Sequence, residues 1–214
     1  MRIDFVSDVV CPWCAIGLNA LERALERIGG DLGPIELHVQ PFELNPSMPP
    51  EGENVSEYLI GKYGMSPQDL ESARATIDAR GVAAGFTFGK REHIWNTFDA
   101  HRLMYWAGVE GPPGAQRALK HELVKAYHGE GRNVSAHDVL LDLATKVGLP
   151  ADRARAVLES DDFASEVRAA EAYWQQAGIH SVPAVVIDRR HLISGGQPSA
   201  VFEQALRQIA SQSG

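Results

Sequence analysis

Residues 5–14 read Phe5-Val6-Ser7-Asp8-Val9-Val10-Cys11-Pro12-Trp13-Cys14, a stretch that ends a strand, begins a helix and holds both cysteines of the chain. Before it, Ile3 and Phe5 alternate with polar residues, which is typical of a strand with one polar side. After it, leucine and isoleucine recur at helical spacing until Gly29-Gly30. The sequence therefore predicts a strand, a cysteine-bearing turn and a helix.

The position of the cysteines predicts their chemistry. Pro12 suits the first turn of a helix, so Cys11 falls at or beside the N-cap and Cys14 one turn further in. Unpaired backbone N–H groups and the helix dipole stabilise a thiolate there, and they lower cysteine pKa values from about 8.5 to roughly 3.5–7.5. Cys11 is the candidate nucleophile and Cys14 the candidate resolving thiol. Asp8 and the uncharged Pro12-Trp13 dipeptide predict weaker activation than a cation between the thiols would give.

Composition limits the possible partners. The chain has 214 residues, 44% of them hydrophobic, which is enough for a substantial core without disulfide staples. Its formal net charge of -8 disfavours nucleic acids and anionic membranes. Neither a signal peptide nor a run near the roughly 18 apolar residues of a membrane span is evident. We expect a cytoplasmic protein, a monomer or homodimer, that acts on protein or low-molecular-weight thiols and disulfides.

A metal site is not expected. A zinc site would need two ligands besides the cysteines, and the candidate histidines have no ligand-like spacing to a partner. These histidines are His38, His93, His101 and His180. No resident cofactor is expected either. In a reducing compartment, a close cysteine pair without metal ligands indicates redox chemistry.

The remaining pattern predicts a sheet interrupted by helices. Residues 34–42 alternate like a second strand, so the chain begins as a βαβ unit with Cys11 at the carboxyl edge of the sheet. Residues 54–160 are helical, with one short alternating run at Phe86-Thr87-Phe88 and a solvated loop at Lys90-Arg91-Glu92-His93. Helix starts are expected at Ser66-Pro67-Gln68-Asp69, near Asn96, Ala115 and Ser135, and at Ala151.

The last part of the chain closes the sheet. A helix over 162–177 leads through Val182-Pro183 into a buried strand over 184–187. A polar turn over 188–190, a strand over 191–194 and a helix from Pro198 follow. The expected fold is α/β, with residues 1–45 and 161–214 forming one domain and residues 46–160 a helical insertion.

This order resembles a thioredoxin fold with an inserted all-helical domain, and the chain resembles the DsbA-like thiol-disulfide oxidoreductases of the FrnE branch. The carriers of the resemblance span the chain: residues 8–14, Pro41-Phe42-Glu43-Leu44-Asn45-Pro46, Asn96-Thr97-Phe98-Asp99-Ala100-His101, Ser181-Val182-Pro183 and Ile193-Ser194-Gly195-Gly196-Gln197-Pro198. The resemblance implies that Cys11 attacks, that Cys14 resolves and that Pro183 is a cis-proline facing them. A cis-proline would leave the Val182 backbone free to pair with an extended substrate.

Roles for five residues in substrate binding follow from this resemblance. They are Pro12, Trp13, Val182, Asn96 and His101. Trp13 is expected at the rim of the site because it lies between the thiols. Asn96 is equally explained as a helix cap, and His101 as a structural histidine.

Two other functions remain open at this point. The fold branch includes glutathione-using 2-hydroxychromene-2-carboxylate isomerases and kappa-type glutathione transferases, which carry serine where Cys11 stands and lack the second cysteine. The loop Gly195-Gly196-Gln197 could bind a glutathione carboxylate through backbone N–H groups. A non-catalytic, chaperone-like module that binds extended peptides is the third alternative.

Overall fold

A four-stranded sheet organises the protein, whose computed structural model describes residues 1–212. Its strands are β1 (Arg2–Ser7), β2 (Glu36–Pro41), β5 (Ala184–Ile187) and β6 (His191–Ser194). The spatial order is β2-β1-β5-β6, with β1 parallel to β2 and antiparallel to β5. Sequence therefore predicted these strands and the parallel βαβ start correctly, and the expected α/β thioredoxin-type fold is confirmed.

Strand β1 is inside the sheet and is buried on both faces. Ile3 and Phe5 pack on one side, whereas Val6 belongs to a separate apolar cluster on the other. The expectation of one polar side was wrong, because Asp4 is fully buried. Its carboxylate accepts hydrogen bonds from Arg2 at 2.7 and 2.9 Å and from Gln40 at 2.7 Å, which satisfies the buried charge.

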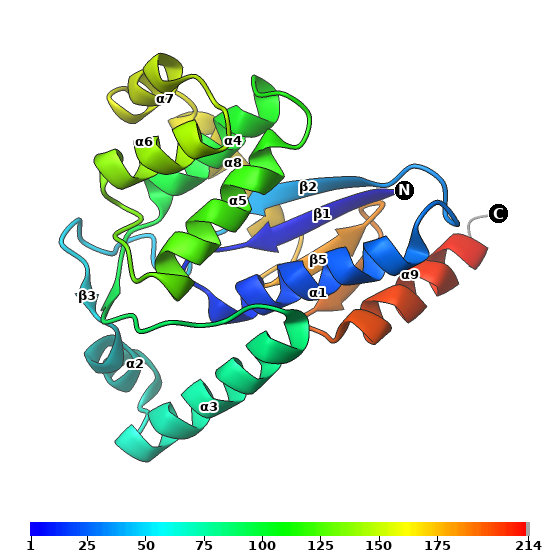
Figure 1. The fold of residues 1–214 in the computed structure, drawn as a ribbon, viewed down its shortest axis with the longest axis horizontal. Coiled ribbons are helices and arrows are strands. Elements are labelled where there is room, and N and C mark those ends of the chain that lie inside the picture. The colour runs from blue at the N-terminus through cyan, green and yellow to red at the C-terminus, as the bar shows by residue number, and fades with distance from the viewer. Residues whose placement is uncertain (213–214) are drawn as a thin grey trace.

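Two helices cover the Ile3 and Phe5 face of the sheet. Helix α1 (Pro12–Ile28) begins at the N-cap Cys11 and ends at Gly29, which has a positive φ of 56°. Helix α9 (Ser199–Gln212) runs beside it (Figure 1) and buries Phe202, Leu206 and Ile209. Both helices share one apolar cluster with β1 and β5, and this cluster fixes where α1 starts relative to the sheet.

The other face of the sheet contacts helix α8 (Ala164–Gln176), which places Trp174 against Val6 and Val186. A larger cluster joins Val9, Val10 and Val39, the last of these from the edge strand β2, to the inserted helices over residues 98–158. In Figure 1 these helices form a group above the strands. The loop that carries the cysteines is thus held between the sheet and the insertion.

The inserted segment is helical with one small sheet. Its elements are β3 (Glu53–Asn54), α2 (Val55–Tyr63), α3 (Pro67–Ala84), β4 (His93–Ile94), α4 (Phe98–Val109), α5 (Ala115–Val124), the π-helix η1 (Lys125–Gly129), α6 (His137–Lys146) and α7 (Ala151–Leu158). Ser66 and Asp69 form a capping box at the start of α3, where the sequence predicts a helix start. The run Phe86–Phe88 is not a strand. The strand pair β3–β4 was not predicted, because two-residue strands carry no periodicity.

The division of the chain into two domains, with boundaries at 45/46 and 160/161, stays a prediction.

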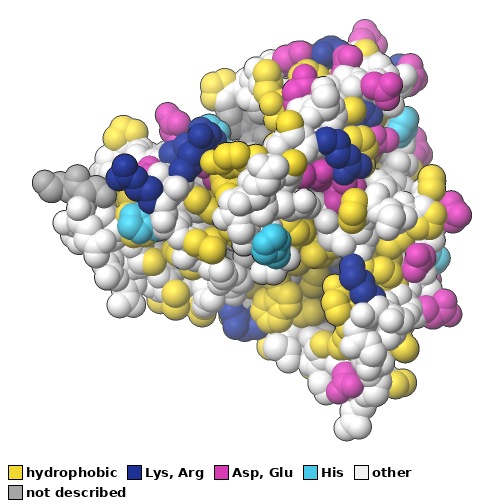
Figure 2. Space-filling model, turned by 180° about the vertical axis from the view of Figure 1, so that it is seen from behind, with side chains coloured by type: hydrophobic (Ala, Val, Ile, Leu, Met, Phe, Trp, Pro, Cys, Tyr) yellow, Lys and Arg dark blue, Asp and Glu magenta, His cyan; other side chains and the backbone are white. Residues whose placement is uncertain are grey.

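Hydrophobic and acidic side chains gather at different places on the surface of the protein (Figure 2). On the face shown in Figure 2, hydrophobic side chains gather in a hollow near the middle, and acidic side chains are spread along its upper and right-hand edges. Within residues 1–212, no helix is long and apolar enough to cross a bilayer.

The packing of α9 on α1 generates a stability prediction. Phe202 is 0% exposed, whereas its neighbour Val201 is 41% exposed. We expect Phe202→Ala to lower the free energy of unfolding by about 3–5 kcal/mol, because it leaves a cavity in the core. Val201→Ala is the matched control and should change it by less than about 0.5 kcal/mol. Urea denaturation measures both, and equal effects of the two substitutions would contradict the packing described here.

Candidate dithiol site

The two thiols lie at the junction of β1 and α1. Both cysteines are free, and they are 3.4 Å apart. Both are buried, but Cys11 keeps 4% exposure whereas Cys14 has none. The backbone N–H groups of Cys14 and Ala15 donate to the Cys11 carbonyl at 3.1 and 3.3 Å, which closes the first turn of the helix. The sequence placed Cys11 at the N-cap correctly.

Hydrogen bonds lower the pKa of Cys11. The main cause is the Cys14 thiol, which donates to the Cys11 sulfur. Burial opposes this effect, the backbone N–H groups of Cys14 and Trp13 add to it, and the charge of Asp8 works against it. The opposing influence of Asp8 is the one the sequence predicts. The thiol–thiol hydrogen bond is an addition that only the folded geometry supplies.

The pKa of Cys14 moves in the opposite direction. Burial raises it well above the usual cysteine range, and the hydrogen bond and charge of Cys11 raise it further. A cation at Lys120 partly opposes the rise. The pair therefore divides into one thiol that ionises readily and one that keeps its proton, which is the asymmetry that a nucleophile and a resolving thiol require.

The segment before β5 faces Cys11. The Val182–Pro183 peptide bond is cis, and the Cys11 thiol donates to the Val182 carbonyl at 3.7 Å. Helix α1 comes close to this loop at Gly17, where a Cβ atom would lie 3.1 Å from Cγ of Pro183. Pro183 and Val182 are thus beside the dithiol, as the resemblance implies.

Buried charges lie behind the cysteines. The Asp8 carboxylate accepts from the Leu44 N–H at 2.8 Å and lies 3.4 Å from Nε2 of His101. Burial raises the pKa of Asp8, but the contacts with His101 and Leu44 and the charge of Lys120 outweigh it and leave the pKa lowered. His101 is thus buried against Asp8, and it does not reach the surface at Cys11.

Lys120 is the least expected of these groups. It comes from α5 in the insertion, is 0% exposed, and its Nζ finds no hydrogen-bond partner among residues 1–212. Burial lowers its pKa, while the charges of Cys14, Asp8 and Cys11 hold it up. One sequence signal existed, since Lys120 interrupts the apolar stripe of Leu119, Leu123, Val124 and Tyr127.

A pocket of about 350 Å³ opens beside Cys11. Its walls are mainly apolar and aromatic, and they come from the start of α1, the Val182 loop and helices α2 and α3. The lining residues used below are Cys11, Pro12, Trp13, Arg91, Tyr127 and Val182. The pocket brings together Pro12, Trp13 and Val182, as the sequence predicts for the substrate side of the site.

Asn96 lies elsewhere. Its amide donates to the Met48 carbonyl at 3.0 Å and accepts from the Phe98 N–H at 2.9 Å, next to the start of α4. Asn96 does not line the pocket at Cys11. Its contacts correspond to the helix-capping interpretation, and a role in substrate binding stays a prediction.

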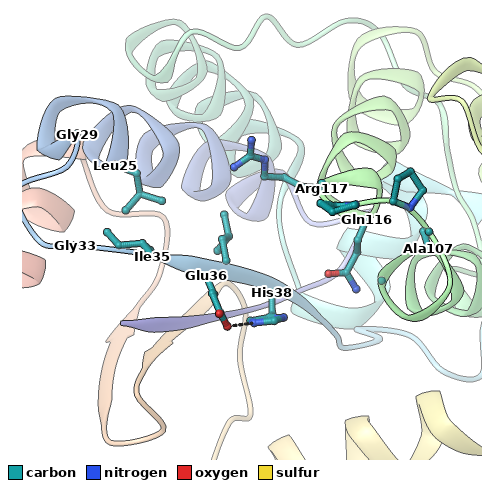
Figure 3. A pocket seen from close by; sticks show the side chains of 15 residues that line it. Leu25, Gly29, Gly33, Ile35, Glu36, His38, Ala107, Gln116 and Arg117 are labelled. Atoms are coloured by element: carbon teal, nitrogen blue, oxygen red, sulfur yellow. Dashed lines mark hydrogen bonds and ion pairs between the residues drawn. The ribbon is translucent and has the colours of Figure 1, made fainter.

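A larger depression of about 740 Å³ lies away from the thiols, between the end of α1, the edge strand β2 and the α4–α5 connection. Figure 3 shows Leu25, Ile35, His38 and Gln116 around it. His38 contacts Glu36 at 3.4 Å there. No cysteine lines this depression, so its size alone does not connect it with redox chemistry.

A thioredoxin-type sheet with two adjacent thiols at the start of a buried helix defines the class of thioredoxin-fold dithiol proteins. The particular family follows from sequence comparison: residues 2–207 match the DSBA-like thioredoxin domain, and the chain belongs to this family. The family resemblance seen in the sequence is therefore confirmed. The narrower FrnE branch stays a prediction.

Three known proteins are similar to this chain. YwbO, an uncharacterized protein of Bacillus subtilis, is 27% identical over 222 residues that cover 96% of each chain. A crystal structure of a probable DsbA oxidoreductase from Streptomyces coelicolor is 35% identical, with a TM-score of 0.89, over 97% of this chain and 89% of that one. A 2-hydroxychromene-2-carboxylate isomerase is 16% identical, with a TM-score of 0.75, over 100% and 98% of the two chains, and shares the fold.

The thiol–thiol hydrogen bond generates a prediction about ionisation. Because the Cys14 thiol is the main cause of the lowered Cys11 pKa, Cys14→Ala should raise that pKa. Cys14→Ser is the matched control, since a hydroxyl still donates and should retain part of the effect. Ultraviolet absorbance of the thiolate against pH measures the change. An unchanged Cys11 titration in Cys14→Ala would show that the helix N-terminus alone sets the pKa.

Lys120 generates a prediction about pH and stability. Its folded-state pKa is lowered, so between that value and its unfolded pKa, about 10.4, the unfolded chain binds more protons. The resulting penalty is largest below the folded pKa and is relieved as the pH rises toward the unfolded one. Lys120→Met should therefore be more stable than wild type at pH 7.

The advantage of Lys120→Met should shrink as the pH rises from the folded-state pKa of Lys120 toward the unfolded-state pKa of about 10.4, because folded wild type then no longer carries the buried charge. Urea denaturation of both proteins between about pH 7 and pH 10 measures it, and charges elsewhere cancel in the comparison. A variant less stable than wild type at every pH would contradict a net cost of burying this cation.

Proposed function

We propose that the chain is a thiol-disulfide oxidoreductase in which Cys11 attacks and Cys14 resolves. The observation that carries this proposal is the asymmetry of two adjacent free thiols: Cys11, which lines the pocket, has a lowered pKa, and Cys14, which is fully buried, has a raised pKa. Membership of the DSBA-like family supports it. The proposed substrates are protein disulfides or low-molecular-weight disulfides.

The proposed reaction has two displacement steps. The Cys11 thiolate attacks one sulfur of the substrate disulfide, the substrate S–S bond breaks, and the leaving thiolate takes a proton from solvent. Cys14 then loses its proton and attacks the Cys11 sulfur, which releases the second substrate thiol and leaves a Cys11–Cys14 disulfide. The same steps in reverse oxidise a dithiol, so the partner pool sets the direction.

Residues around the thiols take supporting roles in this proposal. An extended substrate that donates to the Val182 carbonyl would replace the Cys11 thiol as its hydrogen-bond donor, so the thiolate form would be favoured on binding. Pro183 holds this carbonyl in place, while Pro12 and Trp13 line the pocket. His101 touches Asp8 and is therefore a positioning residue rather than a substrate contact.

Glutathione-dependent isomerisation is less well supported. Two N–H groups of the loop that could hold a glutathione carboxylate are already used, since Gly195 donates to the Pro183 carbonyl at 2.8 Å and Gln197 donates to the Gly195 carbonyl at 2.9 Å. The thiol at Cys11 also differs from the serine that the resemblance implies for those enzymes. Glutathione remains one candidate among the small thiol co-substrates.

Cysteine variants test the proposal. We expect wild type to catalyse reduction of insulin disulfides by a small dithiol, and Cys11→Ser to lose this activity because the attacking thiolate is absent. Cys14→Ser should keep the first step and accumulate a mixed disulfide through Cys11, which mass spectrometry under non-reducing conditions detects.

Three outcomes would contradict this assignment. Undiminished turnover in Cys11→Ser would remove Cys11 from the reaction. Turnover of an aromatic isomerisation substrate that strictly requires glutathione, without disulfide exchange, would favour the isomerase alternative. Binding of unfolded proteins that persists in the double cysteine variant, again without disulfide exchange, would favour a chaperone-like module.

A further inference from the structure

Arg91 is the only acidic or basic side chain that lines the pocket beside Cys11, within the described residues 1–212. Sequence reasoning placed it in a solvated loop, and its neighbours behave that way: Lys90 and Glu92 are exposed and form an ion pair at 2.5 Å. Arg91 is instead half-buried and turns toward the apolar walls. Its side chain therefore adds one positive charge to a pocket whose walls are mainly apolar and aromatic.

His128 holds the guanidinium of Arg91 in this position. Nη1 of Arg91 lies 2.7 Å from Nδ1 of His128, and Nε2 of His128 lies 2.9 Å from the Val9 carbonyl. A guanidinium only donates and a carbonyl only accepts, so His128 carries its proton on Nε2 and accepts at Nδ1. Burial and the Arg91 charge lower the pKa of His128 well below its usual value, which keeps the ring neutral.

The π-helix η1 buries His128 and is hydrogen-bonded to the loop that carries Arg91. Tyr127 and His128 are consecutive, yet both are buried, at 1% and 0% exposure. The Tyr127 hydroxyl donates to the His93 carbonyl at 3.0 Å, and the Gly89 N–H donates to the His128 carbonyl at 2.8 Å. The loop that carries Arg91 is thus tied to η1 on both sides of the arginine.

The charge of Arg91 has no carboxylate partner among residues 1–212. Asp78 lines an adjacent cavity with it, but no carboxylate of the described residues comes within 4.0 Å of the guanidinium. Its carbon Cζ lies 5.6 Å from the centroid of the Tyr127 ring, and one N–H group donates to His128, so the remaining N–H groups have no hydrogen-bond acceptor within the described residues. A guanidinium in this state suits a carboxylate, because the planar fork can donate two parallel hydrogen bonds.

We propose that Arg91 binds the carboxylate of a low-molecular-weight disulfide whose apolar or aromatic body fills the pocket beside Cys11. This inference rests on the proposed function and names the substrate class for the same site. A volume of about 350 Å³ suits one half of such a compound. Cys11 and Cys14 are oxidised to a disulfide, and the substrate disulfide is reduced to two thiols, which take up the two protons that the cysteines lose.

A matched pair of small disulfides tests this inference. The reduced protein is mixed with the dicarboxylate 5,5′-dithiobis(2-nitrobenzoate) or with its neutral bis-amide, and the second-order rate of aryl thiol release is measured. We expect Arg91→Gln to slow the reaction with the dicarboxylate about tenfold and to leave the reaction with the amide within about twofold of wild type. Arg91→Lys should recover part of the loss, since a lysine keeps the charge without the fork.

Two further variants test whether the effect depends on the position of the Arg91 guanidinium or on positive charge near the pocket in general. Lys90→Gln removes the adjacent charge, whose side chain is 84% exposed, and should leave both rates close to wild type. His128→Phe removes the acceptor that holds Arg91 and should reproduce the selective loss on the dicarboxylate. Thermal melting by circular dichroism checks that each variant is folded before its rates are compared.

The possible results distinguish failure of the carboxylate site from failure of the proposed oxidoreductase function. Equal losses on both disulfides in Arg91→Gln, or an equal selective loss in Lys90→Gln, would overturn the carboxylate site and leave the oxidoreductase proposal intact. A third result would assign the pocket to peptides instead. In that case the Arg91 variants would react at the wild-type rate with both small disulfides, and a neutral peptide disulfide would react faster than either of them. Aryl thiol release that does not depend on Cys11 would overturn the proposed function itself.

Discussion

The first turn of α1 at the end of β1 is the constraint on which the site depends. Strand β1 is paired on both edges and buried on both faces, so its end is one of the most fixed points in the fold. The turn that follows places the Cys14 thiol where it can donate to the Cys11 sulfur. A small shift of this turn would weaken the main cause of the lowered Cys11 pKa, because hydrogen bonds weaken steeply with distance and angle.

The inserted helices supply three buried polar side chains behind this turn. Lys120 comes from α5, His101 from α4 and His128 from η1, and all three are buried close to the loop over residues 8–11. Asp8 is the acidic counterpart that the sheet side contributes. Buried charges interact more strongly than exposed ones because water screens them less. The insertion therefore acts on the thiols electrostatically and also forms the walls of their pocket.

A shared fold leaves room for different chemistry. The chain shares its architecture with a 2-hydroxychromene-2-carboxylate isomerase at low sequence identity, so function has to be argued from the side chains at the site. Here those side chains are two free thiols, a mainly apolar pocket and the cation of Arg91 that lines this pocket. The thiols support disulfide exchange, and the pocket and its cation bear on which disulfide is exchanged.

Hydrophobic periodicity and capping residues are local signals, so they were enough to predict the sheet strands, the long helices and the position of Cys11 at a helix N-cap. The family resemblance also placed Val182 and Pro183 correctly. The burial of Asp4, the inward turn of Arg91 and the position of Lys120 beside the thiols became visible only in the folded structure. These features arise between segments far apart in the chain, and a polar side chain carries no local sign of which groups will surround it once the chain has folded.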